Sequence, residues 1–188
     1  MSTTTSSAVR DQLPGAGTWA LDAAHSRVGF VARHMMVSKV RGHFARYQAS
    51  VDIADVPEDS SLAVSIEAAS IDTGARDRDT HLRSPDFLDV ERYPTIDFRS
   101  TRVEDAGNGT WKVTGDLTIR DQTHPVTLDV EFDGKGVNPW GAEVAAFSAS
   151  TELDREQWGL TWNAALETGG VLVGRKVRLE IETELNRS

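Results

Sequence analysis

The chain has 188 residues, of which 39% are hydrophobic, and its 20 Lys and Arg against 29 Asp and Glu give a formal net charge of −9. This composition can bury a core and argues against wholesale disorder. Because the chain has no cysteine, disulfides, iron–sulfur clusters, thiol catalysis and cysteine-based zinc sites are excluded. The acidic balance repels phosphate backbones, so we expect no nucleic-acid partner and no stable membrane anchor.

Residues 1–17 are small, polar and interrupted by glycine and proline. We therefore expect a flexible N-terminal tail at 1–17, followed by a single domain at 18–188. No apolar stretch approaches the ~18 residues that a membrane span requires. Residues 1–10 also lack the apolar core of a secretory signal, which leads us to expect a cytoplasmic protein.

Apolar and polar residues alternate with a period of two through most of the domain, a pattern typical of antiparallel strands with one buried face. In chain order the alternating segments are residues 28–36, 51–53, 62–68, 96–98, 111–113, 117–119, 126–132, 147–153 and 177–185. Turns are predicted at Asn108-Gly109, Asp133-Gly134 and Gly169-Gly170. A count of about eight strands indicates a mainly β sandwich or barrel, and the period alone does not separate the two.

Between residues 73 and 85 the alternation stops and charged residues gather. We expect one short inserted helix here, ending before Pro85, which disfavours a helical conformation at the residue before it. Asp77, Arg78, Asp79 and His81 form the tightest polar cluster of the sequence. The pattern favours a salt-bridged cluster that anchors the helix, and general acid–base work by His81 with a neighbouring carboxylate is the alternative.

The strand period also predicts which side chains face the interior, because alternate residues of a strand point to opposite sides. The expected inward residues are Phe30, Met36, Val64, Ile66, Phe98, Leu117, Ile119, Leu128, Val130, Leu179 and Ile181. His34 shares the parity of Phe30. We interpret it either as a core histidine satisfied by one hydrogen bond or as a polar handle for the head of a ligand in an apolar cavity.

Catalytic and metal motifs are weak in this sequence. His25, His34 and His43 are nine residues apart, so along one strand successive imidazoles would face opposite sides rather than form a row of ligands. The sequence contains no Gly-x-Ser-x-Gly elbow and no glycine-rich phosphate loop. We therefore assign no catalytic residue, no metal site and no cofactor.

A local block of positive charge interrupts the acidic chain. Residues 23–51 contain no Asp or Glu but five basic residues, namely Arg27, Arg33, Lys39, Arg41 and Arg46. The block is either a solvated surface or a positive rim that steers an anionic head group, such as a phosphate or carboxylate, to a cavity mouth.

At several motifs the sequence resembles the YceI-like family of polyisoprenoid-binding, lipocalin-like proteins. The resemblance runs from about Thr18 to the C-terminus and is most specific between Thr73 and Phe98. Its motifs are Trp19-Ala-Leu-Asp22-Ala-Ala-His25-Ser26, Phe30-Val-Ala-Arg-His34, Val40-Arg-Gly42-His-Phe44, Ile71-Asp-Thr73, Arg78-Asp79-Thr-His81-Leu82-Arg-Ser84-Pro-Asp86-Phe87-Leu-Asp89, Tyr93-Pro94-Thr-Ile-Asp-Phe98, Gly115-Asp-Leu117-Thr118-Ile119, Asp154-Arg155-Glu-Gln-Trp-Gly159-Leu160 and Val173-Gly174. Two departures are the absence of the secretion signal that many members carry and the segment Arg120-Asp121-Gln122 where a small residue is usual.

The resemblance implies an elongated antiparallel barrel of about eight strands, with a helix beside it and a long apolar tunnel for an isoprenoid or similar amphiphilic chain. The ligand-binding residues would then be Phe30, His34, Met36, Phe44, Val64, Ile66, Phe98, Leu117, Ile119, Leu128, Val130 and Leu179. The residues of a head-group rim would be Arg33, Lys39 and Arg41.

Three functions fit these observations. The favoured one is a non-catalytic carrier, with a long-chain amphiphilic lipid as its partner and a homodimer compatible with the sequence. The second is a hydrolase or isomerase that acts on an amphiphilic substrate in the same cavity. The third is a stress-related protein whose barrel is packed solid.

Overall fold

A computed structural model describes residues 13–188, so most of the predicted tail lies outside the described residues. Its helical segments are η1 (Pro57–Asp59), η2 (Ala68–Ser70), α2 (Arg76–Arg83) and η3 (Arg155–Trp158). The strands are β1 (Gly17–His34), β2 (Ser38–Phe44), β3 (Tyr47–Ile53), β4 (Ser61–Glu67), β5 (Ile71–Asp72), β6 (Thr95–Gly107), β7 (Thr110–Ile119), β8 (Gln122–Val137), β9 (Glu143–Asp154) and β10 (Val173–Arg187). No helix of the described part is long and apolar enough to cross a membrane.

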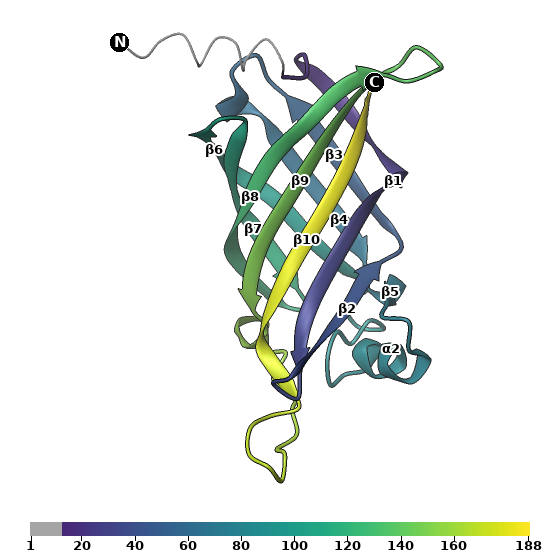
Figure 1. The fold of residues 1–188 in the computed structure, drawn as a ribbon, viewed down its shortest axis with the longest axis vertical. Helices are drawn as coiled ribbons and strands as arrows, with labels where there is room; N and C mark the ends of the chain where they lie inside the picture. The colour runs from purple at the N-terminus through teal and green to yellow at the C-terminus, as the bar shows by residue number, and fades with distance from the viewer. Residues whose placement is uncertain (1–12) are drawn as a thin grey trace.

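Eight of the strands close into an elongated antiparallel barrel (Figure 1). The hydrogen-bonded order is β10-β9-β8-β7-β6-β4-β3-β1, and β10 returns to pair with β1. A closed ring of this kind excludes the sandwich and confirms the predicted barrel. In Figure 1 the β8–β9 hairpin marks the upper end of the barrel. The β1–β2 turn, α2 and the loop of residues 159–172 mark its lower end.

The barrel wall departs from a simple ring beside β1. The upper end of β1 pairs with β3 from Gly17 to Ala20, and its lower half pairs with β2 from Val28 to His34. The two-residue strand β5 then pairs with the end of β2 and is the last strand of the sheet on that side. Helix α2 lies beside this lower edge (Figure 1). One short helix was predicted here, and the structure confirms it.

The predicted alternation is plain in β7, where Trp111, Val113, Leu117 and Ile119 are buried and Lys112 is exposed. Opposed residues of an antiparallel pair lie on the same face of the sheet. The register places Val113 opposite Leu128, and Leu117 opposite Phe98. Repeated around the barrel, these pairs build the lower core and confirm the predicted inward residues except Met36.

Met36 was predicted to continue the inward row of β1, and this prediction is wrong. β1 ends at His34, and Met35 and Met36 form a tight turn with φ of 52° and 59°. Met36 is 59% exposed. The apolar pattern missed the turn because methionine is not a typical turn residue.

Of the predicted turns, Asn108-Gly109 joins β6 to β7, with both residues at positive φ as a tight hairpin requires. Asp133-Gly134 is not a turn. β8 continues to Val137, and Gly134 lies at a register shift against β9, because glycine serves a β-bulge as well as a turn.

Candidate functional site

The interior of the barrel is lined by apolar side chains, and many of them are only partly buried. Since they lie on the inward face of a closed wall, the surface that they expose faces the interior of the barrel. In the larger of two packed clusters these residues include Phe30, Leu62, Val64, Ile66, Val103, Val130, Leu179 and Ile181. In the smaller cluster, around Trp19, they are Leu21, Val51, Ile53, Phe132 and Phe147. An interior of this kind can accept an apolar chain.

Two phenylalanine rings fill the lower interior by lying over glycines. A Cβ added at Gly42 would collide with the ring of Phe30, and one added at Gly115 would lie 2.5 Å from Cζ of Phe98. Phe30 also packs against Phe44, with 5.8 Å between the ring centroids. Both glycines therefore set how far the rings withdraw from the centre of the barrel.

Two tryptophans lie within the barrel near its opposite ends. Trp19 belongs to the upper core, and its indole donates a hydrogen bond to the carbonyl of Gly15 (3.1 Å). Trp158 of η3 is 2% exposed, and its indole donates to the carbonyl of Leu117 (3.0 Å). Each indole pairs its one polar hydrogen and presents its apolar body to the core.

Arg155 fixes the loop that follows Trp158. Its guanidinium is almost fully buried and donates to three main-chain carbonyls, those of Leu160 (2.5 Å), Val173 (3.4 Å) and Gly174 (3.0 Å). Burial lowers the pKa of Arg155, because the charged form loses its hydration. By donating to all three carbonyls, the guanidinium holds the start of the loop, at Leu160, beside the start of β10.

Two buried polar atoms of the β7–β8 wall have no hydrogen-bond partner among the described residues. They are Nε1 of Trp111 and Nε2 of His124, whose ring packs edge-on against Trp158 with 5.2 Å between centroids. His124 is opposite Leu117, six residues along β7 from Trp111, which corresponds to about 20 Å. Sequence reasoning passed over both, although each shares the parity of its apolar strand neighbours.

His34 lies half-buried at the lower end of β1, between Ser38 of β2 and Val173 of β10. Its imidazole makes no hydrogen bond within residues 13–188, while its carbonyl accepts from the amide of Val37 (3.1 Å). The role of His34 as a polar handle stays a prediction. The same is true of ligand contact by the other residues predicted to bind.

The residues predicted to form a rim lie on the outer wall near the lower end. Arg33 is directly opposite Lys39, and Arg41 is opposite Val31, which places all three exposed side chains on the outward face. Arg46 is separate from them and is held by Glu67 through two contacts of 2.6 Å. That pairing raises the pKa of Arg46.

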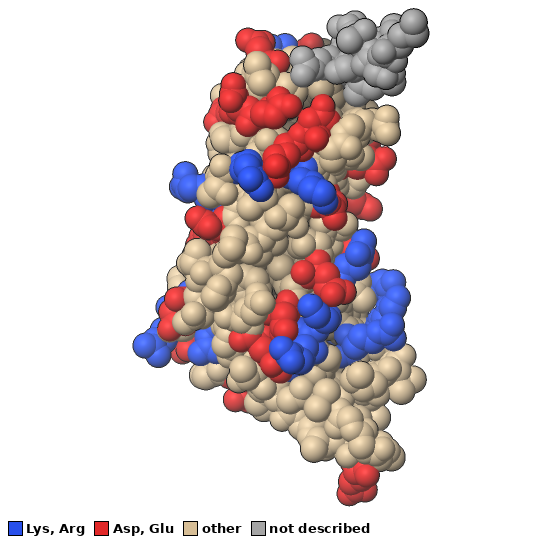
Figure 2. Space-filling view, turned by 90° about the vertical axis from the view of Figure 1, so that its left-hand side faces the viewer, with Lys and Arg blue, Asp and Glu red and all other residues tan. Residues whose placement is uncertain are grey.

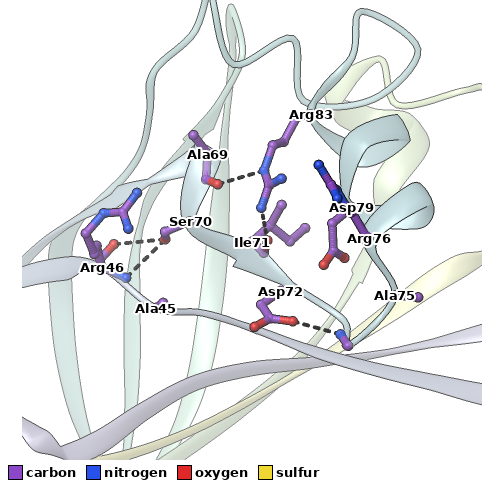
Figure 3. A pocket seen from close by; sticks show the side chains of 11 residues that line it. Ala45, Arg46, Ala69, Ser70, Ile71, Asp72, Ala75, Arg76, Asp79 and Arg83 are labelled. Atoms are coloured by element: carbon purple, nitrogen blue, oxygen red, sulfur yellow. Dashed lines mark hydrogen bonds between the residues drawn. The ribbon is translucent and has the colours of Figure 1, made fainter.

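The polar cluster of α2 anchors the helix. Asp79 is buried and accepts from the amide (2.9 Å) and hydroxyl (2.6 Å) of Thr73. Arg83 donates to the carbonyls of Ala69 and Ile71, both at 2.8 Å. Asp79 and Arg83 line a surface depression of about 460 Å³ between α2 and the β2–β3 junction (Figure 3). His81 instead contacts Asp86, at 2.8 Å.

One group among the described residues has the composition of a metal site. The ligand atoms of Asp22, His25 and Glu184 lie within 4.8 Å of one another. A structural role explains them, because Asp22 accepts from the amides of Ala24 (2.9 Å) and His25 (3.3 Å) where β1 bulges. The hydrogen bond between the two side chains lowers the pKa of Asp22 and raises that of His25.

Comparison with known proteins identifies the fold family. The model of the YceI-like domain matches residues 19–185. A UPF0312 protein of Staphylococcus epidermidis is 39% identical over 168 residues, which cover 88% of this chain and 95% of that protein. The crystal structure of a YceI protein from Campylobacter jejuni is 29% identical, with a TM-score of 0.72, and the match covers 83% of this chain and 90% of that one.

A second similar structure is that of a polyisoprenoid-binding domain from Saccharophagus degradans. It shares 14% identity and a TM-score of 0.62, and the match covers 93% of this chain and all of that one. At this identity the likeness concerns the fold alone. From the family match over nearly the whole barrel, together with the closed eight-stranded wall, the chain belongs to the YceI-like family.

Proposed function

We propose that this protein is a non-catalytic carrier that holds a polyisoprenoid or similar long-chain lipid inside its barrel. The observation that carries the proposal is the set of inward apolar side chains that retain exposed surface within a closed wall. Each methylene group moved from water into such an interior contributes about 0.8 kcal/mol. A chain of several isoprene units therefore binds without needing many polar contacts.

Polar groups at two heights of the interior support a ligand with a polar end. Two nitrogens have no hydrogen-bond partner within residues 13–188: Nε2 of His124, in the lower part of the β7–β8 wall, and the indole nitrogen of Trp111, nearer its upper end. A buried polar atom without a partner is unfavourable, and because neighbouring atoms cover both nitrogens, a ligand oxygen would satisfy the indole only after the side chains around it move. The polyisoprenoid-binding domain of Saccharophagus degradans, with its similar fold, further supports a lipid of this class.

The positions of the histidine–carboxylate pairs favour a carrier over an enzyme. General acid–base catalysis needs its acid and base within reach of the bound substrate. His25 pairs with Asp22 at the bulge of β1, and its side chain is 66% exposed. His81 pairs with Asp86, whose side chain is half exposed beyond the end of α2. Both pairs open to solvent.

The test compares two phenylalanine substitutions at adjacent positions of β9. Ala149 is opposite the inward residues Val130 and Ile181, whereas Ser150 is on the other face, opposite Asp129 and Glu180. Ala149→Phe should fill interior space and weaken binding of polyprenyl phosphates by about tenfold or more. The matched control Ser150→Phe should bind like the wild type.

Binding is measured by native mass spectrometry and by the rise in Tm with a series of polyprenyl phosphates and long-chain quinones. A ligand that binds only the folded state raises Tm by mass action. No bound chain and no shift in Tm at any length would contradict the carrier. Unchanged binding by folded Ala149→Phe would place the lipid outside the barrel interior.

A further inference from the structure

The lower end of the barrel exposes a cluster of apolar side chains that the carrier function does not use. In the β1–β2 turn, Met35 is 45%, Met36 59% and Val37 81% exposed, and Val171 of the neighbouring loop is 36% exposed. The turn and the loop are joined by a hydrogen bond from the amide of Met35 to the carbonyl of Leu172 (2.8 Å). We call Met35, Met36, Val37 and Val171 the apolar tip.

Three cations lie immediately beside the apolar tip on the outer wall. Arg33 and Lys39 are each two residues from the turn and directly opposite each other, and Arg41 follows on the same face. None of the three forms an ion pair or a side-chain hydrogen bond with any residue in the described range 13–188. We call Arg33, Lys39 and Arg41 the basic collar.

The neighbouring cations of β10, by contrast, have acidic partners. Arg175 contacts Asp154 (2.7 Å) and Glu156 (3.0 Å), Lys176 lies 3.8 Å from Glu152, and Arg178 lies 3.3 Å from Glu180. The collar instead sets two like charges opposite each other, which destabilises a sheet. Fold stability therefore gives no reason for this arrangement in a chain of net charge −9.

Among the described residues, the opposite end of the barrel lacks this combination. Trp140 and Val137 are also strongly exposed there, but Lys135, two residues before Val137, donates to the carbonyl of Leu13 (2.8 Å). Arg187 near that hairpin is paired with Glu143. Only at the lower end do an exposed apolar cluster and unpaired cations adjoin within the described chain.

The charge of the collar and the chemistry of the tip together define the partner. Unpaired cations select an anionic surface, and exposed Met and Val side chains select one with an apolar interior below its charge. The loop beside the tip is compatible with this, since Glu167 is its only charged residue. On the face drawn in Figure 2, the lower end is correspondingly almost free of charged side chains.

We propose that the apolar tip and the basic collar dock the barrel reversibly on an anionic lipid bilayer, with the β1–β2 wall tilted toward it. This goes beyond the carrier function, because it names the surface at which a lipid would be taken up or delivered. Docking does not require a lipid in the barrel. The two proposals can therefore fail separately.

The absence of cysteine allows a single reporter to be placed at either end of the barrel. Val37→Cys, labelled with an environment-sensitive fluorophore, should shift to the blue with vesicles of phosphatidylglycerol and phosphatidylcholine. It should not shift with phosphatidylcholine alone, and added salt should reverse the shift. Val137→Cys, exposed at the opposite end, is the control and should not respond. Equal responses at both ends, or equal responses to neutral vesicles, would overturn the proposal.

A second comparison tests the collar through vesicle co-sedimentation. Replacing Arg33, Lys39 and Arg41 together by Gln should weaken binding to the anionic vesicles by about tenfold or more, since each cation near such a surface contributes a severalfold gain. The matched control replaces three exposed cations of β6 and β7, namely Arg99, Arg102 and Lys112, by Gln. It makes the same change in net charge and should bind like the wild type. An equal loss in both triple variants, each with wild-type Tm, would show only general charge attraction and reject the collar.

Discussion

Replacing Arg155 by Met should destabilise the protein through the loss of three hydrogen bonds to main-chain carbonyls. A hydrogen bond from a charged donor contributes about 1.5–3 kcal/mol, so three give roughly 5–9 kcal/mol before correction. Burial of the guanidinium, which lowers the pKa of Arg155, opposes this by several kcal/mol. We expect a net loss of about 2–4 kcal/mol in the free energy of unfolding.

Arg155→Lys separates the geometry of the guanidinium from its charge. The single nitrogen of an ammonium group cannot donate to the carbonyls of Leu160, Val173 and Gly174 with the geometry of the three guanidinium nitrogens. It would still carry the desolvation penalty, so Lys should be no better than Met. Arg175→Met is the matched control, because this neighbouring side chain is 62% exposed and its ion pairs with Asp154 and Glu156 contribute about 0–1 kcal/mol.

Urea denaturation followed by tryptophan fluorescence measures these differences, and Tm should fall by roughly 4–16 °C for Arg155→Met. Limited proteolysis within residues 159–172 provides a local readout, since these bonds anchor the loop. If the free energy of unfolding of Arg155→Met lay within about 1 kcal/mol of the wild-type value, or if Arg155→Lys were as stable as the wild type, the three hydrogen bonds of the guanidinium would not be the source of stability.

Two further predictions concern the β1 bulge and the interior glycines. The pKa of His25 is raised above its ordinary value of 6.5, so its pairing with Asp22 stabilises the fold fully below pH 6.5, and this stability is lost as pH rises through the folded pKa. The pKa of Asp22 is lowered below its ordinary value of 3.8, so the same pairing stabilises the fold above pH 3.8, and this stability is lost as pH falls through the folded pKa. His25→Asn should therefore lose stability mainly between these ordinary values, and urea midpoints that differ equally at every pH would contradict this. Gly115→Ala should cost about 2–3 kcal/mol, because the new Cβ would lie 2.5 Å from the main-chain oxygen of Arg99, whereas Gly42→Ala meets only side chains and should cost about 1 kcal/mol. Equal denaturation midpoints for the two glycine variants would show that main-chain contact is not decisive.

The strand period predicted the wall and most of the interior, because every inward residue must meet an inward residue on each neighbouring strand. It failed at Met36, because Met35 and Met36 both adopt positive φ in a turn that methionine does not predict. It also failed at Gly134, since sequence does not distinguish a glycine at a bulge from one at a turn.

Functional details were harder to predict because they depend on contacts between distant segments. The basic block was visible in the sequence, but only the strand register shows that Arg33 faces Lys39 on the outer wall. Whether the ring nitrogens of Trp111 and His124 find a partner in the described part of the chain depends on which groups lie around them in space. Ring and carbonyl partners more than 30 residues away, such as the carbonyl of Leu117 for Trp158, leave no local signal.

The free edge of β5 has a consequence for the motions of the barrel. Everywhere else in the wall, separating neighbouring strands breaks a ladder of main-chain hydrogen bonds. Beside β5 the carbonyls of Ala69 and Ile71 are bound by the single guanidinium of Arg83. Opening the barrel beside β5 should therefore cost less free energy than separating two paired strands of the wall, and amides of α2 should exchange with deuterium before those of the strands. Such an opening would let a long flexible chain enter the interior laterally, while both ends of the barrel stay folded.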